Sequence, residues 1–166
     1  MRKASLGFAV AALVFFLEQI TKWIVLGPLD LRNVGLIELM SIFDLRYTEN
    51  HGISLGLFQA SSDFMRWVLV ALTSAIAVGV GWWITREEKP GDQIALGMVL
   101  GGALGNIVDR VRHGYVVDFA DLHFGDFRPF LIFNVADAAI SIAVVILLLR
   151  AFLTRKDGPK ETIEHA

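Results

Sequence analysis

Residues 67–84 read WVLVALTSAIAVGVGWWI, an apolar run without a charged side chain. A helix of about 20 mostly apolar residues crosses the hydrocarbon core of a bilayer, so this run predicts a transmembrane helix. Further apolar stretches at 6–26, 94–108 and 135–153 are long enough, or nearly so, to span as well. The sequence therefore predicts four transmembrane helices, with outer loops at about 27–66 and 109–134.

The composition agrees with a membrane protein and excludes several other classes. Of 166 residues, 55% are hydrophobic and 19% are charged, whereas soluble domains average about 45–50% apolar and about 25% charged residues. So short a chain cannot bury this apolar excess in a core of its own. A net charge of −2 lacks the basic surface that nucleic-acid binding requires. The absence of Cys excludes disulfides, a thiol nucleophile and lipidation on cysteine.

Small residues in the third stretch indicate that the spans pack as a bundle. Gly97, Gly101 and Gly105 recur every four residues and leave one helix face bare for a close neighbour. The first stretch begins like a secretory signal peptide, but polar residues that include Glu18 and Lys22 stand where a small-residue cleavage site belongs. We expect it to remain attached, as the first span of a single integral-membrane domain over residues 1–166.

The loops predict the orientation and the remaining elements. Lys and Arg are denser near both termini and in 85–93 than in the long loops, which predicts cytoplasmic termini. Residues 43–48 alternate apolar and polar side chains, and 114–119 are rich in strand formers. Residues 55–58 and the Phe-rich stretch 122–133 suit the outer membrane interface. The predicted fold class is membrane all-α: four transmembrane helices, with small β elements and an interfacial helix in the extracytoplasmic loops.

Polar side chains gather at one level of this arrangement. Spans 1 and 3 end, and spans 2 and 4 begin, at the outer leaflet. Ionisable residues at membrane depth are costly, so a functional site facing the bundle interior is their default interpretation. The polar residues at this level are Glu18, Lys22, Asn106, Asp109, Arg110, Asn134 and Asp137, with Asp118 in the loop between.

Structural roles are open for most of these residues. Glu18 and Lys22 form an i,i+4 pair in the favourable order. Asn134 and Asp137 have the spacing of a capping box at the start of the fourth span. Arg110 can extend its side chain to the interface or pair with the carboxylate beside it.

Asp118 and Asp137 support a chemical hypothesis. Asp118 lies between apolar residues, a setting in which an isolated carboxylate is costly. Two carboxyl groups that approach in a partly dry site cannot both ionise, so one keeps a proton while the other stays basic. Such a pair can activate water for attack on a peptide carbonyl.

Other constellations are weaker. Residues 52–56 (GISLG) match the nucleophile-elbow pattern around Ser54, but that motif needs an α/β sheet that does not fit here. Histidines at 51, 113 and 123 could join Asp118 or Asp121 at zinc, but their spacing matches no zinc motif, so we expect no metal. The acidic residues lie at one surface and do not form the path across the bilayer that an ion carrier needs.

Four short segments follow one another along the chain: TENHG at 48–52, GGALGNIVDR at 101–110, GYVVDF at 114–119 and FNVAD at 133–137. In order and spacing they resemble the signature blocks of the lipoprotein signal peptidase family, also called signal peptidase II. The resemblance includes the four-span layout and covers nearly the whole chain. It implies a bacterial inner-membrane aspartic peptidase that removes signal peptides from prolipoproteins after their lipobox cysteine has received a diacylglyceryl group.

By this resemblance, Asp118 and Asp137 match the catalytic dyad. Lys22 matches a lysine late in the first span, and Glu18 stands where the family usually has Asp. The segment after Asn50 is also looser than the family's small-residue run. The residues that match polar positions around the dyad are Asn50, Gly52, Asn106, Arg110 and Asn134.

The resemblance also implies the partners and the location. The expected partners are diacylglyceryl-modified prolipoproteins and membrane lipids, with no cofactor, no nucleic acid and no required oligomer. The peptide bond beside a lipidated cysteine lies near the membrane surface, so the active site is expected at the outer face. The alternatives are a non-catalytic scaffold for lipidated precursors and a serine-dependent intramembrane protease that uses Ser54.

Overall fold

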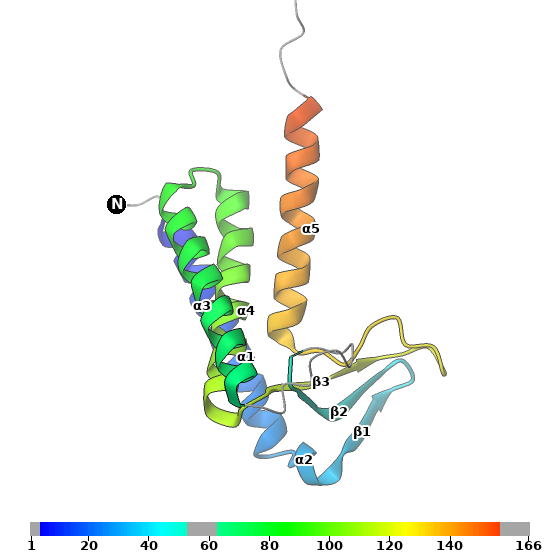
Figure 1. Cartoon of the computed structure of the whole chain (residues 1–166). Helices are drawn as coiled ribbons and strands as arrows, with labels where there is room; N and C mark the ends of the chain where they lie inside the picture. Colours follow the sequence, from blue (N-terminus) through cyan, green and yellow to red (C-terminus); the bar gives the residue numbers. More distant parts are fainter. Residues whose placement is uncertain (1–3, 53–62, 157–166) are drawn as a thin grey trace, which may run out of the picture.

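The computed structural model describes residues 4–52 and 63–156. Its long helices are α1 (Ser5–Leu26), α3 (Asp63–Arg86), α4 (Pro90–His113) and α5 (Val135–Lys156), and a small sheet lies at one end of them (Figure 1). Among the residues that the structure describes, four helices are long and apolar enough to cross a membrane. The predicted class, membrane all-α with four transmembrane helices and small β elements, is confirmed.

α4 packs against each of the other long helices, and its glycines permit the close approach. Gly97 and Gly101 lie directly against the backbone of α1. A Cβ atom on Gly102 would lie 2.8 Å from the carbonyl oxygen of Ala136 in α5. Because neither neighbour is a flexible side-chain tip, larger residues would force the helices apart. The predicted role of small residues in bundle packing is therefore confirmed.

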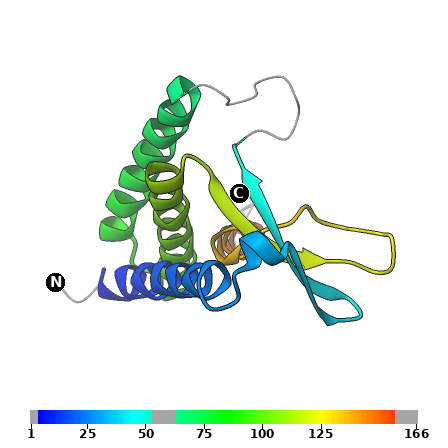
Figure 2. The same cartoon turned by 90° about the horizontal axis from the view of Figure 1, so that it is seen from below.

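The sheet joins two loops that are far apart in the sequence. Strands β1 (Leu36–Met40), β2 (Phe43–Asn50) and β3 (Val116–Leu122) are antiparallel in the order β1-β2-β3. They extend sideways from the helix ends (Figure 2). Asn50 pairs with Val116, and Thr48 pairs with Asp118. This register brings the end of β2 beside the start of β3, directly next to the bundle.

Two helices extend beyond the predicted spans. The third span was expected at 94–108, but α4 runs from Pro90 to His113, where Gly114 ends it in a left-handed conformation. The outer loop expected from 109 therefore begins five residues later, and Asp109 and Arg110 belong to the helix. Charged side chains lower the hydropathy of this last turn but do not interrupt a helix. α3 likewise begins at Asp63, inside the loop expected at 27–66.

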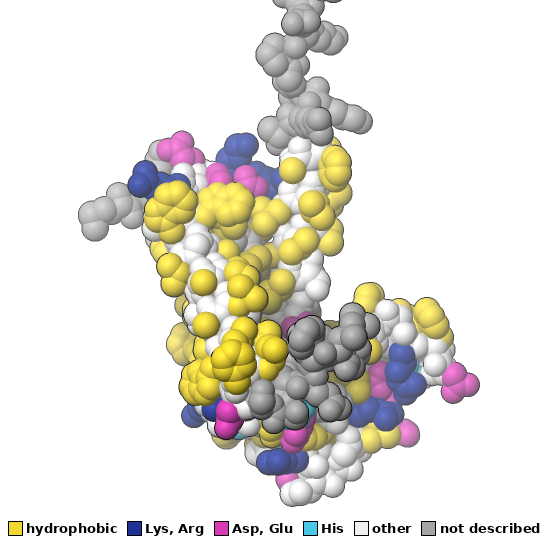
Figure 3. Space-filling view, in the orientation of Figure 1, with side chains coloured by type: hydrophobic (Ala, Val, Ile, Leu, Met, Phe, Trp, Pro, Cys, Tyr) yellow, Lys and Arg dark blue, Asp and Glu magenta, His cyan; other side chains and the backbone are white. Residues whose placement is uncertain are grey.

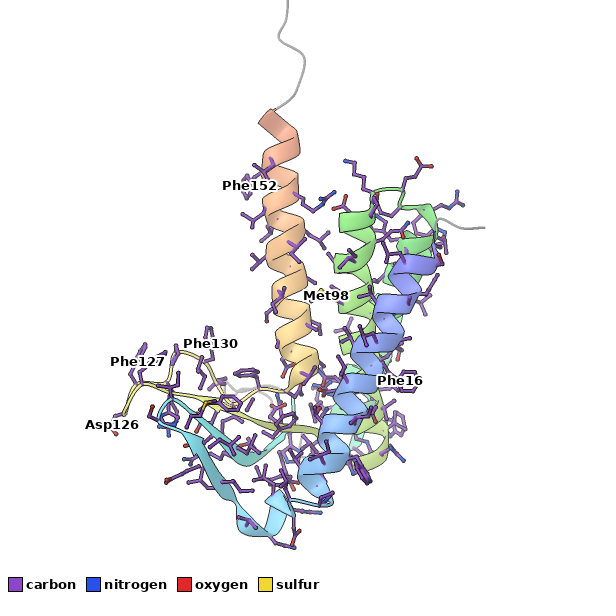
Figure 4. All side chains as sticks on the ribbon, turned by 180° about the vertical axis from the view of Figure 1, so that it is seen from behind. Phe16, Met98, Asp126, Phe127, Phe130 and Phe152 are labelled. Carbon is purple, nitrogen blue, oxygen red and sulfur yellow. The ribbon has the colours of Figure 1, made fainter. Side chains whose placement is uncertain are left out.

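The surface of the long helices suits lipid. Phe16 of α1 is 59% exposed and Phe152 of α5 is 68% exposed, and both project outward (Figure 4). Hydrophobic side chains cover the middle of the helices, and charged side chains gather toward the ends (Figure 3). Such a surface would be unstable in water, so it requires a bilayer.

The predicted interfacial segments have different outcomes. Residues 55–58 lie outside the described part of the chain. In the 122–133 stretch, Phe124 bridges Phe127 in a tight turn, and Phe127 and Phe130 are exposed at its edge (Figure 4). The helix described in the outer loops is α2 (Leu31–Val34), which follows α1. The position of the 122–133 stretch in the membrane interface stays a prediction.

Candidate active site

The start of α5 is a reciprocal capping box. Asn134 Oδ1 accepts a hydrogen bond of 2.9 Å from the Asp137 backbone N–H. Asp137 Oδ2 accepts one of 3.3 Å from the Asn134 backbone N–H. These contacts satisfy two N–H groups that a helix start leaves unpaired. The capping interpretation of the sequence is confirmed, and it fixes the direction of both side chains.

Asp118 lies on β3 and is only 2% exposed. The Asn50 amide donates a hydrogen bond of 2.9 Å to its Oδ2. The Asn134 amide donates one of 2.7 Å to its Oδ1. Each oxygen of the carboxyl group thus has a donor, one from the end of β2 and one from the cap of α5. The side chain is held from two sides.

Two asparagines connect Asp118 with Asp137. The Asn106 amide, from α4, donates a hydrogen bond of 3.1 Å to Asp137 Oδ1. The Asn134 amide lies 3.2 Å from Asn106 Oδ1 and also donates to Asp118. The two carboxyl groups therefore belong to one hydrogen-bond network, built by three elements and closed by the sheet register. Predicted site residues that are far apart in sequence meet here.

The electrostatics of the two carboxyl groups differ. Burial raises the pKa of Asp118 to about 7, because desolvation penalises its charged form. The Asn50 hydrogen bond lowers this pKa, and the nearby Asp137 carboxyl raises it. Asp137 is only partly buried. Near neutral pH the site can therefore hold one proton on the buried carboxyl group beside a more accessible partner.

Arg110 and Gly52 lie at the edge of this network. The Arg110 guanidinium interacts electrostatically with Asp137 and Asp118, while its buried Nε has no hydrogen-bond partner among the described residues. Gly52 has a φ of +108°, a conformation that favours glycine, and its N–H donates a 2.9 Å hydrogen bond to Asn50 Oδ1. A Cβ atom there would lie 3.9 Å from an Arg110 terminal nitrogen. Arg110 thus retains an unused donor beside the carboxyl groups.

Glu18 and Lys22 are buried next to the network. They form an ion pair with each other, as their i,i+4 spacing indicated. Lys22 Nζ also lies 2.5 Å from Asp109 Oδ2. Sequence reasoning placed Asp109 at the correct membrane level but gave it no part in the site. The pairing crosses from α1 to α4, and no local spacing signals it.

The candidate serine and zinc sites considered in the sequence have different outcomes. Ser54 lies outside the described residues. The rings of His51 and His113 lie 5.4 and 6.0 Å from that of Tyr115, whereas His123 pairs with Asp44. Within residues 4–52 and 63–156, no group of three or more His, Cys, Asp or Glu side chains is placed to hold a metal ion.

A family model described as "Signal peptidase (SPase) II" matches residues 10–153. The chain belongs to the signal peptidase II family. The lipoprotein signal peptidase of Sphingopyxis alaskensis is 60% identical to it over 147 residues, which cover 89% of this chain and 85% of the relative. That of Rhizorhabdus wittichii is 58% identical over 160 residues, which cover 96% of this chain and 92% of the relative.

Solved structures agree with this membership. One, described as a bacterial membrane enzyme, matches with a TM-score of 0.75 at 25% identity and covers 94% of this chain and 92% of that chain. As a member of the signal peptidase II family with four apolar helices, the chain is a peptidase of the bacterial inner membrane. The resemblance found in the sequence is confirmed.

Proposed function

We propose that this signal peptidase II removes the signal peptide from diacylglyceryl-modified prolipoproteins, and that Asp118 and Asp137 are its catalytic dyad. The observation that carries the proposal is the network in which Asn106 and Asn134 tie the two carboxyl groups together. Relatives 58% and 60% identical to this chain are lipoprotein signal peptidases, which supports the substrate class.

The mechanism follows from one shared proton. Asp118, whose pKa is raised to about 7, holds the proton, and the more accessible Asp137 acts as the general base. Asp137 takes a proton from water as its oxygen attacks the peptide carbonyl before the lipidated cysteine. Asp118 donates to the carbonyl oxygen, and a proton passes to the leaving amine as the C–N bond breaks.

The residues around the dyad orient the substrate. Arg110, whose guanidinium interacts electrostatically with both carboxyl groups, is suited to bind a backbone carbonyl of the scissile segment. Asn50 and Gly52 line the same edge, where a Cβ atom on Gly52 would collide with the Leu69 side chain of α3. Fixing the peptide within reach of the dyad supplies much of the acceleration in such sites. Lys22 and Glu18, which are buried next to the network, support the dyad.

The arrangement also supports an orientation. The first described residues, the α3–α4 turn and the end of α5 lie at one end of the bundle, and the sheet and the dyad lie at the other (Figure 1). With both termini in the cytoplasm, the dyad faces the outer leaflet. There the acyl chains of a lipidated precursor remain in lipid while its peptide bond reaches water. One chain supplies all these groups, so an oligomer is not required.

The test is cleavage of a purified diacylglyceryl-modified precursor by Asp118→Asn and Asp137→Asn, each shown to be inserted in the membrane. Both variants should bind the precursor and release no signal peptide. Asp126→Asn, at an exposed residue of the same outer face, is the matched control and should cleave normally. Normal cleavage by either dyad variant would refute the mechanism.

The alternatives give other results in the same assay. A scaffold binds the lipidated precursor without shortening it, even as wild type. A serine protease loses activity in Ser54→Ala and keeps it in both Asp variants. A metal-dependent enzyme is inhibited by a chelator.

A further inference from the structure

A second cluster of charges is buried next to the dyad. It consists of Glu18 and Lys22 on α1 and Asp109 on α4, and is called the charge triad below. Lys22 forms ion pairs with both carboxylates, and the three side chains are 4% exposed or less. Burying charges costs desolvation energy, and apolar side chains often give equal stability. The charge triad therefore needs an explanation other than stability.

Both carboxylates of the charge triad accept a backbone N–H from another element. Asp109 Oδ2 accepts a hydrogen bond of 2.9 Å from Val117 in β3. Glu18 Oε2 accepts one of 3.1 Å from Ala136 in α5. Val117 directly precedes Asp118, and Ala136 directly precedes Asp137. The charge triad thus holds the backbone at the residue before each dyad member.

We infer that the charge triad positions the catalytic dyad, with Lys22 as the link that joins the two backbone anchors. This inference rests on the proposed function. Hydrogen bonds to ionised acceptors are stronger and shorter than neutral ones, so the two anchors resist displacement. They connect α1, α4, β3 and α5, the elements that must stay in register for the two carboxyl groups to share one proton. The three residues are positioning residues, because none needs to touch the substrate.

The packing of α4 is consistent with this role. A Cβ atom on Gly105 would lie 2.9 Å from Glu18 Cγ, so the glycine provides the space in which the Glu18 side chain runs. The Glu18 carboxylate then reaches both the Lys22 ammonium and the Ala136 N–H. A function for the glutamate at position 18 follows: it spans from α1 to the first turn of α5.

The test uses the double variant Glu18→Gln/Lys22→Met in the full-length chain. It removes one negative and one positive charge, so the net charge near the dyad is unchanged, while Asp109 and Asp118 both lose the nearby Lys22 ammonium. The matched control is Asp92→Asn/Arg150→Met, which removes an ion pair between α4 and α5 at the other end of the bundle. Turnover of a diacylglyceryl-modified precursor is measured for kcat and KM separately, with the unfolding temperature in detergent.

We expect kcat of the double variant to fall by about 10- to 100-fold while KM stays within about threefold, because misplaced catalytic groups slow chemistry more than binding. The control should stay within about twofold of wild type in both. A kcat within about threefold of wild type, or an increase in KM alone, would overturn the inference. So would an equal loss of kcat in the control.

Conservative variants keep the inference testable if the double variant does not insert. Lys22→Arg and Glu18→Asp retain both charges but change their reach, and each should lower kcat by about tenfold in a folded protein. Unchanged kcat in both would overturn the inference. Asp137→Asn is assayed in parallel: its normal turnover would refute the dyad itself, whereas normal turnover in the triad variants would refute only the positioning.

Discussion

Replacing Asn50 with Ala removes one of the two side-chain hydrogen bonds that Asp118 accepts. The Asn50 amide lies 2.9 Å from Asp118 Oδ2 and lowers the pKa of this carboxyl group, because it stabilises the charged form. A hydrogen bond to a charged group contributes about 1.5–3 kcal/mol, and 1.36 kcal/mol corresponds to one pH unit. The pKa of Asp118 in the variant should therefore rise from about 7 by about one unit or more.

This change is visible in the pH dependence of kcat/KM. In the proposed mechanism activity requires the proton on Asp118, so the alkaline limb of the wild-type profile should lie near pH 7 and that of Asn50→Ala near about pH 8. The absolute rate also falls, but the position of the limb does not depend on it. Asn33→Ala removes an exposed Asn–Asp contact on the outer loops and is the matched control. A limb that stays in place or moves to lower pH would refute the reasoning.

Three further predictions concern stability and packing. The raised pKa of Asp118 means that the folded state binds a proton more tightly than the unfolded state. The free energy of unfolding should therefore fall by about 4 kcal/mol as pH rises from about 4 to above 7. The thermal unfolding temperature of Asp118→Asn should depend less on pH than that of the wild type. Gly102→Ala brings a Cβ within 2.8 Å of the Ala136 carbonyl oxygen and should cost about 1–3 kcal/mol in chemical denaturation. Asn134→Ala removes a helix cap worth about 1 kcal/mol and the link between the carboxyl groups, so it should abolish turnover in a protein that still inserts.

Hydropathy predicts the transmembrane part of the fold because lipid imposes a simple requirement on length and polarity. The same measure gives a third span shorter than α4, since Asp109 and Arg110 are charged although the helix continues through them. β1 was not predicted. Its residues, Leu36–Met40, show no alternation between buried and exposed positions, and the strand is held mainly by pairing with β2.

The sequence likewise predicts some features of the candidate site and not others. Asp118 and Asp137 could be found because costly charges converge at one membrane level. The double role of Asn134, as helix cap and as donor to Asp118, depends on how β3 is placed against the start of α5. The contact between Lys22 and Asp109 joins residues 87 positions apart. Such contacts depend on tertiary packing, which local spacing does not encode.

The proposed mechanism requires that the buried carboxyl group of Asp118 holds a proton near neutral pH. Infrared difference spectroscopy of the membrane-embedded chain, with Asp118→Asn as the reference for band assignment, measures this protonation state directly. We expect a protonated carboxyl band from Asp118 at about pH 6 that disappears as the pH rises through about 7. Complete ionisation of Asp118 at about pH 6 would contradict it.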